Sequence, residues 1–218
     1  MERMGLRGWL LGALGVVGVL AMLAIPSAST VGTTGGQSPA PAVAKPAVVP
    51  GCEQGCETVF SSPLPGGGRL DGLSSHGSSV LAYWIGGNLL DTKQVLGTEG
   101  RPYDSVTSGT CGSGRCSVTF EYGAHSAAVA SLRLDTKITV NGTVEGILAD
   151  ARDLNGDGMP DASIRQSTYE PSFSLAPMYW ETYLLQGDNL VPTGCSEPVH
   201  GPQDPPAVPA TGQCPLNI

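Results

Sequence analysis

The nine residues from Asp153 to Asp161 read Asp-Leu-Asn-Gly-Asp-Gly-Met-Pro-Asp and place oxygen donors at regular spacing. The first, third, fifth and ninth positions carry carboxylate or amide oxygens, and these are Asp153, Asn155, Asp157 and Asp161. The seventh residue, Met159, can offer its main-chain carbonyl. Calcium takes oxygen ligands in this number and order from loops. The sequence therefore predicts a calcium site over residues 153–161, with calcium as the cofactor.

The other residues of this run suit a loop that encloses an ion. Three carboxylates close together repel one another, and a divalent cation turns that repulsion into attraction. Gly156 and Gly158 permit positive φ, and Pro160 stiffens the exit toward Asp161. An ion-free turn remains the alternative, because Asp, Asn and Gly also form turns through local hydrogen bonds.

The segments on either side of the loop favour strands. An EF-hand needs a glutamate six residues after the central glycine and a helix on each side, but that position is Ile164. Residues 143–149 and 161–168 instead have the composition of extended chain. The expected arrangement is strand, loop and strand.

A strand, loop and strand with the spelling Asp-x-Asn-x-Asp-Gly-x-Pro-Asp resembles the calcium loop of FG-GAP (VCBS-like) repeats, which occur in integrin-type propeller blades and in many secreted bacterial proteins. The resemblance implies five ligands: Asp153, Asn155, Asp157, the Met159 carbonyl and Asp161. It covers one copy of the loop and its flanking strands. A propeller needs several blades, so the propeller fold and its adhesive role are not carried over.

The rest of the domain is expected to be all-β. Residues 117–122 alternate polar with apolar side chains, and residues 128–140 do so as one strand or a bent pair. Residues 80–85 are apolar on both faces, which is typical of a central strand. Residues 178–185 and 190–191 flank a Gly-Asp-Asn turn and predict a hairpin. We expect a single antiparallel sandwich or small open barrel over residues 52–195, stapled by disulfides, with the calcium loop between two strands.

The two ends of the chain differ in composition from the predicted β domain. Arg3 and Arg7 precede an apolar run over residues 9–25, which predicts a signal peptide over residues 1–29 or, if uncleaved, a membrane anchor. Residues 30–51 are expected to form a disordered Pro/Gly/Ala/Thr linker, and residues 196–218 a Pro-rich tail. These features predict a secreted or extracytoplasmic protein whose contact with a membrane is limited to the N-terminal segment.

Six cysteines follow the signal segment, and export makes disulfides the default state. Three close pairs are visible, but six cysteines allow fifteen pairings and spacing does not choose among them. Cys111 and Cys116 form the best local candidate. A bridge from Cys52 or Cys56 to Cys195 is slightly favoured, because it would clamp the ends of the domain. Zinc is the rival, although these gaps do not match paired zinc knuckles.

Charge and aromatic content limit the partners. The chain has 11 basic and 19 acidic residues, which argues against nucleic acid as a partner. Aromatic residues cluster after the predicted calcium loop. Alternation predicts that Trp180 points inward and that Tyr179 and Tyr183 point outward, where they form a face for a carbohydrate or peptide ligand. Core packing is the other interpretation of these rings.

Catalysis has little support in the sequence. No Gly-x-Ser-x-Gly elbow is present, and His76 beside two serines has no identifiable orienting acid. Asp135, Glu145, Asp150 and Glu170 are available carboxylates without a spacing that pairs them. The favoured hypothesis is an exported noncatalytic, calcium-stabilised β domain acting in binding or cell-envelope structure. The alternative is a small secreted hydrolase with a site built from loops.

Overall fold

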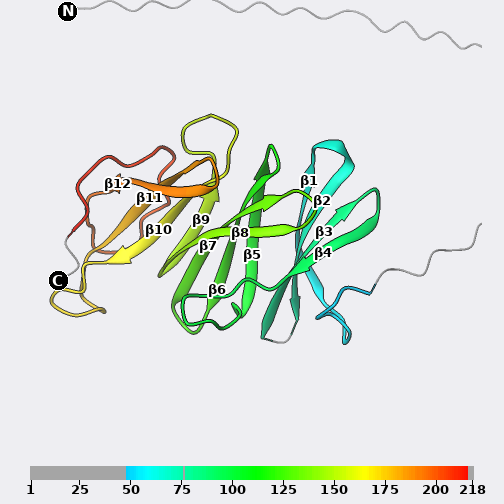
Figure 1. Ribbon diagram of the computed structural model, residues 1–218. Coiled ribbons are helices and arrows are strands. Elements are labelled where there is room, and N and C mark those ends of the chain that lie inside the picture. The colour runs from blue at the N-terminus through cyan, green and yellow to red at the C-terminus, as the bar shows by residue number, and fades with distance from the viewer. Residues whose placement is uncertain (1–47, 76, 216–218) are drawn as a thin grey trace, which may run out of the picture. The chain divides into compact units, whose positions relative to one another are not determined.

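The computed structural model describes residues 48–75 and 77–215 (Figure 1). This part of the chain contains no α-helix, one 3-10 turn at Pro65–Gly67 (η1), and strands that all pair antiparallel. The strands are β1 (Glu57–Leu64), β2 (Gly68–Ser75), β3 (Ser78–Ile85), β4 (Asn88–Lys93), β5 (Ser105–Gly112), β6 (Arg115–Tyr122), β7 (Ser126–Leu134), β8 (Ile138–Gly146), β9 (Leu148–Arg152), β10 (Asp161–Ser167), β11 (Met178–Gln186) and β12 (Asn189–Cys195).

The strands form three four-stranded sheets in chain order. The first sheet contains β1 to β4, the second β5 to β8 and the third β9 to β12, and within each sheet every strand pairs with the next in sequence. None of these three sheets, which include all strands of the described residues, closes into a barrel. The predicted all-β, antiparallel and disulfide-stapled fold is therefore confirmed, and its sandwich has three layers.

The three sheets stand in a row with two cores between them (Figure 1). The core between the first and second sheets contains Leu70 and Leu81 from the first and Phe120 from the second. Alternation along β7 explains the middle layer, because Ala128 belongs to this core while Val129 belongs to the core facing the third sheet. The second sheet is thus covered on both faces, and it also holds the buried polar residues Ser117, Thr119 and Ser131.

Several predicted strands are present. Residues 128–140 form the end of β7 and the start of β8, with a turn in which the amide of Asp135 donates to the carbonyl of Lys137. The hairpin predicted near residue 187 is the β11–β12 hairpin, and residues 80–85 lie in β3, an inner strand of the first sheet. The structure therefore confirms the strands that were predicted from sequence patterns.

Short segments of the chain cover the outer faces of the two end sheets. On the first sheet, Val49, Cys52 and Cys56 pack against Val80 and Ala82. On the third sheet, the tail after Cys195 covers β11: the Trp180 indole N–H donates to the Gln203 carbonyl (3.2 Å), and the Ala210 amide donates to the Thr182 hydroxyl (2.9 Å). Both covers are segments outside the strands.

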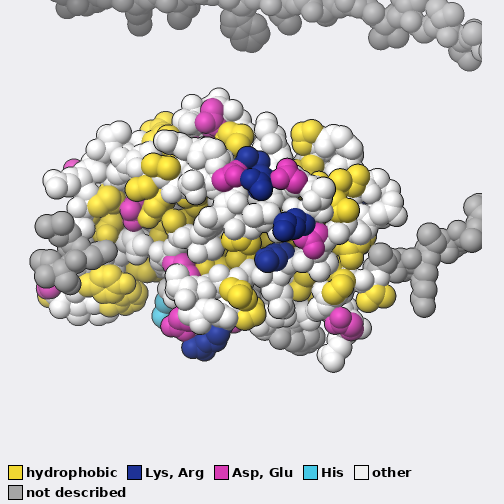
Figure 2. Space-filling view, viewed as in Figure 1, with side chains coloured by type: hydrophobic (Ala, Val, Ile, Leu, Met, Phe, Trp, Pro, Cys, Tyr) yellow, Lys and Arg dark blue, Asp and Glu magenta, His cyan; other side chains and the backbone are white. Residues whose placement is uncertain are grey.

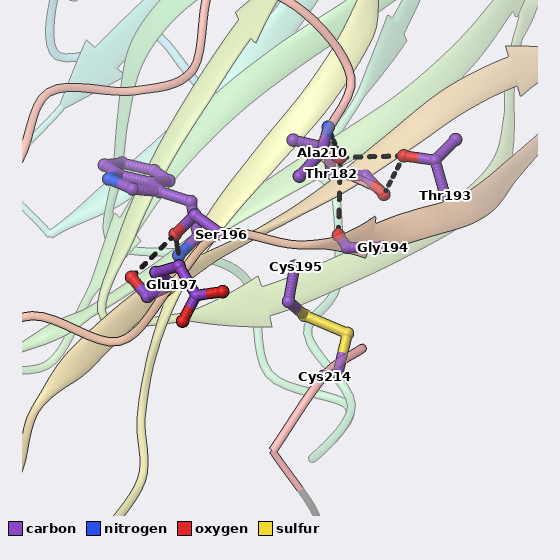
Figure 3. The surroundings of a disulfide bond; sticks show 9 residues. Thr182, Thr193, Gly194, Cys195, Ser196, Glu197, Ala210 and Cys214 are labelled. Atoms are coloured by element: carbon purple, nitrogen blue, oxygen red, sulfur yellow. Dashed lines mark hydrogen bonds between the residues drawn. A yellow bond between two sulfur atoms is a disulfide. The ribbon is translucent and has the colours of Figure 1, made fainter. Parts of the chain in front are cut away.

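Each cover contains or adjoins a disulfide. The bonds join Cys52 to Cys56, Cys111 to Cys116 and Cys195 to Cys214. Figure 3 shows the last of these, which fastens the tail to the end of β12. The expected bridge from Cys52 or Cys56 to Cys195 is wrong, because these cysteines belong to sheets at opposite ends of the row and each pairs within its own end.

The N-terminal predictions lie outside the described residues. This applies to the signal or anchor over residues 1–29 and to all but the last residues of the linker over residues 30–51. Within residues 48–75 and 77–215, we find no helix long and apolar enough to cross a membrane.

Candidate metal site

The acidic run forms the loop between β9 and β10, the first two strands of the third sheet. Asp161 begins β10 and pairs with Arg152 at the end of β9, so the loop closes between antiparallel neighbours as predicted. The Asp153 carboxylate accepts amide hydrogens from Gly156 (2.7 Å) and Gly158 (2.8 Å). Both glycines have φ near +80°, at 78° and 79°, which is why the chain can curl around that carboxylate.

The middle of the loop is held by its own side chains. Asn155 Oδ1 accepts the amide hydrogen of Asp157 (3.0 Å), and Asn155 Nδ2 donates to Asp157 Oδ2 (2.9 Å). Asp157 Oδ1 in turn accepts the amide hydrogen of Met159 (2.8 Å). The side chains of Asp153, Asn155 and Asp157 are exposed, and Met159 is half-buried. Hydrogen bonding from the Gly158 amide lowers the pKa of Asp153, so this group is anionic at neutral pH.

Asp161 differs from the other acids because its side chain is fully buried, with 0% exposure. Its carboxylate accepts amide hydrogens from Leu154 (2.9 Å) and Leu185 (2.8 Å). Burial raises the pKa of Asp161, and the charges of Asp157 and Asp153 raise it further. No Lys or Arg of the described residues forms an ion pair with Asp161. A buried carboxylate without a cation is unusual, since buried charges are normally paired or bound to a metal.

The loop also packs against the second sheet. The Ser117 hydroxyl of β6 donates to the Pro160 carbonyl (2.6 Å), and the Thr110 hydroxyl of β5 donates to the Ala151 carbonyl (3.1 Å). Gly112, at the end of β5, lies against the carbonyl of Gly158. The position of the loop is therefore set by the hairpin that the Cys111–Cys116 disulfide closes.

The donor types fit calcium, while the carboxylates are not gathered around a common point. Each Asp oxygen that accepts one amide hydrogen keeps a further lone pair for a cation. The oxygens of Asp153, Asp157 and Asp161 do not all lie within 4.8 Å of one another. In the described part of the chain, the potential ligand atoms of Glu181, Cys195 and Cys214 do lie within that distance of one another. Those two sulfurs are joined in a disulfide and offer no thiolate to a metal.

Of the two tyrosines predicted to form an aromatic face, Tyr179 is buried and Tyr183 is half-buried. Tyr179 has 1% exposure and Trp180 has 2%. The inward and outward assignments were reversed: Tyr183 packs against Val129 and Ile164 in the core between the second and third sheets, whereas Trp180 lies under the tail. Because the tail covers one face of β11 and the second sheet covers the other, neither face presents a flat aromatic surface.

Glu145 lies outside the acidic loop, beside a cavity of about 370 Å³. Its carboxylate accepts hydrogen bonds from the Tyr103 hydroxyl (2.8 Å), the Tyr122 hydroxyl (3.1 Å), and the amide and hydroxyl of Thr98 (both 3.0 Å). Burial alone would raise the pKa of Glu145, but these hydrogen bonds outweigh it and lower the pKa. Burial and the Glu145 charge raise the pKa of Tyr122 to about 12. An anionic, fully bonded carboxylate is a structural anchor and a poor general acid.

The other candidate catalytic groups have local partners or lie elsewhere. Asp135 pairs with Arg133 (2.8 Å), and Asp150 pairs with Arg152 (2.5 Å). Glu170 is exposed in the β10–β11 loop, and His76 is outside the described residues. Comparison with protein-family models, with curated proteins and with solved structures finds no match to this chain. Function is therefore inferred from its own residues and contacts.

Proposed function

We propose that this chain is an exported, noncatalytic β domain that binds calcium through residues 153–161 and acts in binding or in cell-envelope structure. Export is supported by the basic start, apolar run and small residues of the N-terminal sequence, and by cysteines that all pair in disulfides. The proposed ligands are Asp153, Asn155, Asp157, the Met159 carbonyl and Asp161.

The observation that supports calcium most directly is the buried carboxylate of Asp161. It is 0% exposed, it has no basic partner among the described residues, and the charges of Asp153 and Asp157 act on it. A divalent cation would supply the missing positive charge. Asp153 and Asp157 are exposed at the same loop, and an ion there would have to compete with the hydrogen bonds that their carboxylates accept from within the loop.

The proposed role of the ion is to stabilise the junction of the second and third sheets. The loop contacts β6 through the hydrogen bond from Ser117 to Pro160, and it contacts β11 through the bond from Leu185 to Asp161. An ion that binds only the folded loop stabilises every contact that depends on the loop.

The resemblance to FG-GAP repeats gains support from the sheet arrangement. Propeller blades are four-stranded antiparallel sheets, and this chain contains three such sheets in succession. The acidic loop joins the first two strands of its sheet, and the other two sheets have short turns at the corresponding places. We therefore propose one calcium loop in a row of three blade-like sheets.

Thermal melting of the full chain with calcium, with magnesium and with a chelator tests the proposal. At a calcium concentration one hundred times Kd, binding adds about 2.7 kcal/mol to the free energy of unfolding. For a chain of this size, that corresponds to a rise of roughly 5–10 °C in Tm. Equal Tm values in calcium and chelator would contradict calcium binding, and equal shifts with both metals would point to a site without calcium preference.

A further inference from the structure

A cavity of about 410 Å³ lies at the end of the third sheet opposite the calcium loop. The β10–β11 connection, residues 168–177, and the first part of the tail form its walls. Ile147, Leu175 and Met178 supply apolar surface to the cavity, and Arg165 and His200 supply nitrogen donors. Small-ligand clefts have volumes of roughly 300–1,000 Å³ and combine apolar walls with a few polar groups.

Hydrogen bonds hold both walls in place. The Thr168 amide donates to the Pro177 carbonyl (3.0 Å), which closes the base of the 168–177 connection. On the tail side, Met178 and Val199 exchange main-chain hydrogen bonds of 2.9 and 2.8 Å. The Cys195–Cys214 disulfide ties down the far end of the tail. The cavity is therefore formed by fixed segments before any ligand arrives.

Arg165 gives the cavity its positive charge. Among the described arginines, the other five, namely Arg69, Arg101, Arg115, Arg133 and Arg152, each form an ion pair with an Asp or Glu. Within residues 48–75 and 77–215, the guanidinium of Arg165 donates only to the Gly201 carbonyl (2.5 Å), and its buried Nε has no acceptor. A guanidinium has five N–H donors, so Arg165 retains unused donors.

The residues around Arg165 do not neutralise that charge. No Asp or Glu is among the residues that line this cavity. By contrast, Glu99, Asp104 and Glu145 line the cavity beside Tyr103. In a chain with net charge −8, the described lining of this cavity has an arginine and no acid, which favours an anion over a cation.

An exposed apolar surface continues outward from the cavity. Leu175 is 63% exposed, Phe173 42% and Tyr169 55%, and the rings of Tyr169 and Phe173 lie 5.9 Å apart. Figure 2 shows hydrophobic side chains gathered at the end of the molecule where this connection lies. Contiguous exposed apolar patches on soluble proteins often mark sites that contact a ligand or a partner.

We propose that this cavity binds an apolar carboxylate, meaning a carboxylate group on an aliphatic or aromatic body. The Arg165 guanidinium pairs with the carboxylate, a geometry that favours two parallel hydrogen bonds. The apolar body packs on Ile147, Leu175 and Met178. Two sources share this chemistry: a free aliphatic or aromatic acid, and the C-terminal end of an apolar peptide.

Calorimetric titration of the full chain with octanoate tests the proposal, with 1-octanol and acetate as matched probes that lack the charge or the apolar body. Octanoate is expected to bind at least tenfold more tightly than either probe. Arg165→Gln is expected to weaken octanoate binding at least tenfold, whereas Arg101→Gln, which removes an exposed arginine, leaves it unchanged. Octanol binding as tightly as octanoate, or an unaffected Arg165→Gln variant, would overturn the proposal.

Two further experiments exclude a folding defect as the cause of lost binding and identify the source of the carboxylate. If Arg165→Gln lowers Tm, Leu175→Ser is tested instead, because the exposed Leu175 side chain can be replaced without leaving a cavity in a core. Unchanged octanoate affinity of Leu175→Ser would overturn the proposal. A Leu-Phe dipeptide with a free C-terminus is then compared with its amidated form. Tighter binding of the free peptide than of octanoate identifies a chain end as the source, and weaker binding identifies a free acid. Equal binding of the free and amidated forms would contradict a carboxylate site.

Discussion

Gly112 at the end of β5 lies directly against the main-chain carbonyl of Gly158 in the acidic loop, so that a methyl group on Gly112 would overlap the Gly158 oxygen. Gly112 ends a strand of the second sheet and Gly158 lies in a loop of the third, so the contact brings the turn closed by Cys111–Cys116 against the proposed calcium loop. The absence of a side chain at Gly112 is therefore a requirement of the junction between the second and third sheets.

The first prediction concerns this contact. Gly112→Ala is expected to lower the free energy of unfolding by about 1–3 kcal/mol, because the methyl group displaces main-chain atoms that cannot rotate away. Gly142→Ala in β8 is the matched control, since a Cβ there meets nothing within 4 Å, and we expect a change within roughly 0.5 kcal/mol. Urea unfolding measures both variants. Equal stabilities of the two would show that the loop shifts freely away from β5.

The second prediction concerns the proposed ion. Asp157→Ala is expected to abolish the rise in Tm that calcium produces, because it removes a charged ligand from the centre of the loop. Glu121→Ala removes an exposed acid from β6 and is expected to keep the full calcium response. Melting curves with calcium and with chelator compare the two variants. A calcium response in Asp157→Ala as large as in the parent protein would contradict the ligand assignment.

The third prediction concerns pH. The folded-state pKa of Glu145 lies below its ordinary value of 4.5, so this group contributes stability above that pH and loses the contribution as pH falls through the folded-state pKa. Glu145→Gln is expected to cost on the order of 1 kcal/mol at pH 7. The difference from the parent protein should shrink as the pH is lowered from 7 through the folded-state pKa, which lies below 4.5.

Urea unfolding in chelator across this pH range measures that difference, with Glu121→Gln as the control. Tyr103→Phe removes the 2.8 Å hydrogen bond to Glu145 and should destabilise the protein in the same pH-dependent direction. A constant difference between Glu145→Gln and the parent protein at every pH would exclude an anionic anchor.

The fourth prediction concerns the tail. The Cys195–Cys214 bond spans 19 residues and the Cys52–Cys56 bond spans 4, so chain-entropy estimates give stabilisations of about 3 and about 2 kcal/mol. Replacing Cys195 and Cys214 by Ala is expected to be the more destabilising change and to open residues 196–213 to limited proteolysis. Replacing Cys52 and Cys56 by Ala is the control. A tail equally resistant to protease in both variants would show that its hydrogen bonds suffice to hold it.

Sequence patterns predicted the strands well because a half-buried strand repeats every two residues. The alternation in residues 117–122 and 128–140 corresponds to β6, β7 and β8. The same pattern could not assign faces in β11. Tyr183 faces the second sheet and Trp180 is buried under the tail, so both faces of β11 are covered. Because the tail covers the outer face of this end sheet, side chains on both faces of β11 are buried, and alternation alone does not distinguish the two faces.

The acidic loop was visible in the sequence because all its donors lie within nine residues. The Glu145 cluster was not visible, because its partners Thr98, Tyr103 and Tyr122 are 47, 42 and 23 residues away. The disulfides show a similar contrast. Adjacent cysteines pair within single turns or segments, whereas the favoured long bridge required knowledge of how many sheets separate the two ends.

The segments that cover the two end sheets also affect whether a second copy of the protein can stack on those sheets. Each outward face is covered by a segment of the same polypeptide; the Cys195–Cys214 disulfide fastens one segment to β12, and the Cys52–Cys56 disulfide closes a loop within the other. A second copy could stack on an end sheet only after the covering segment had been displaced. The arrangement therefore favours a row that terminates after three layers over one that lengthens into a fibre.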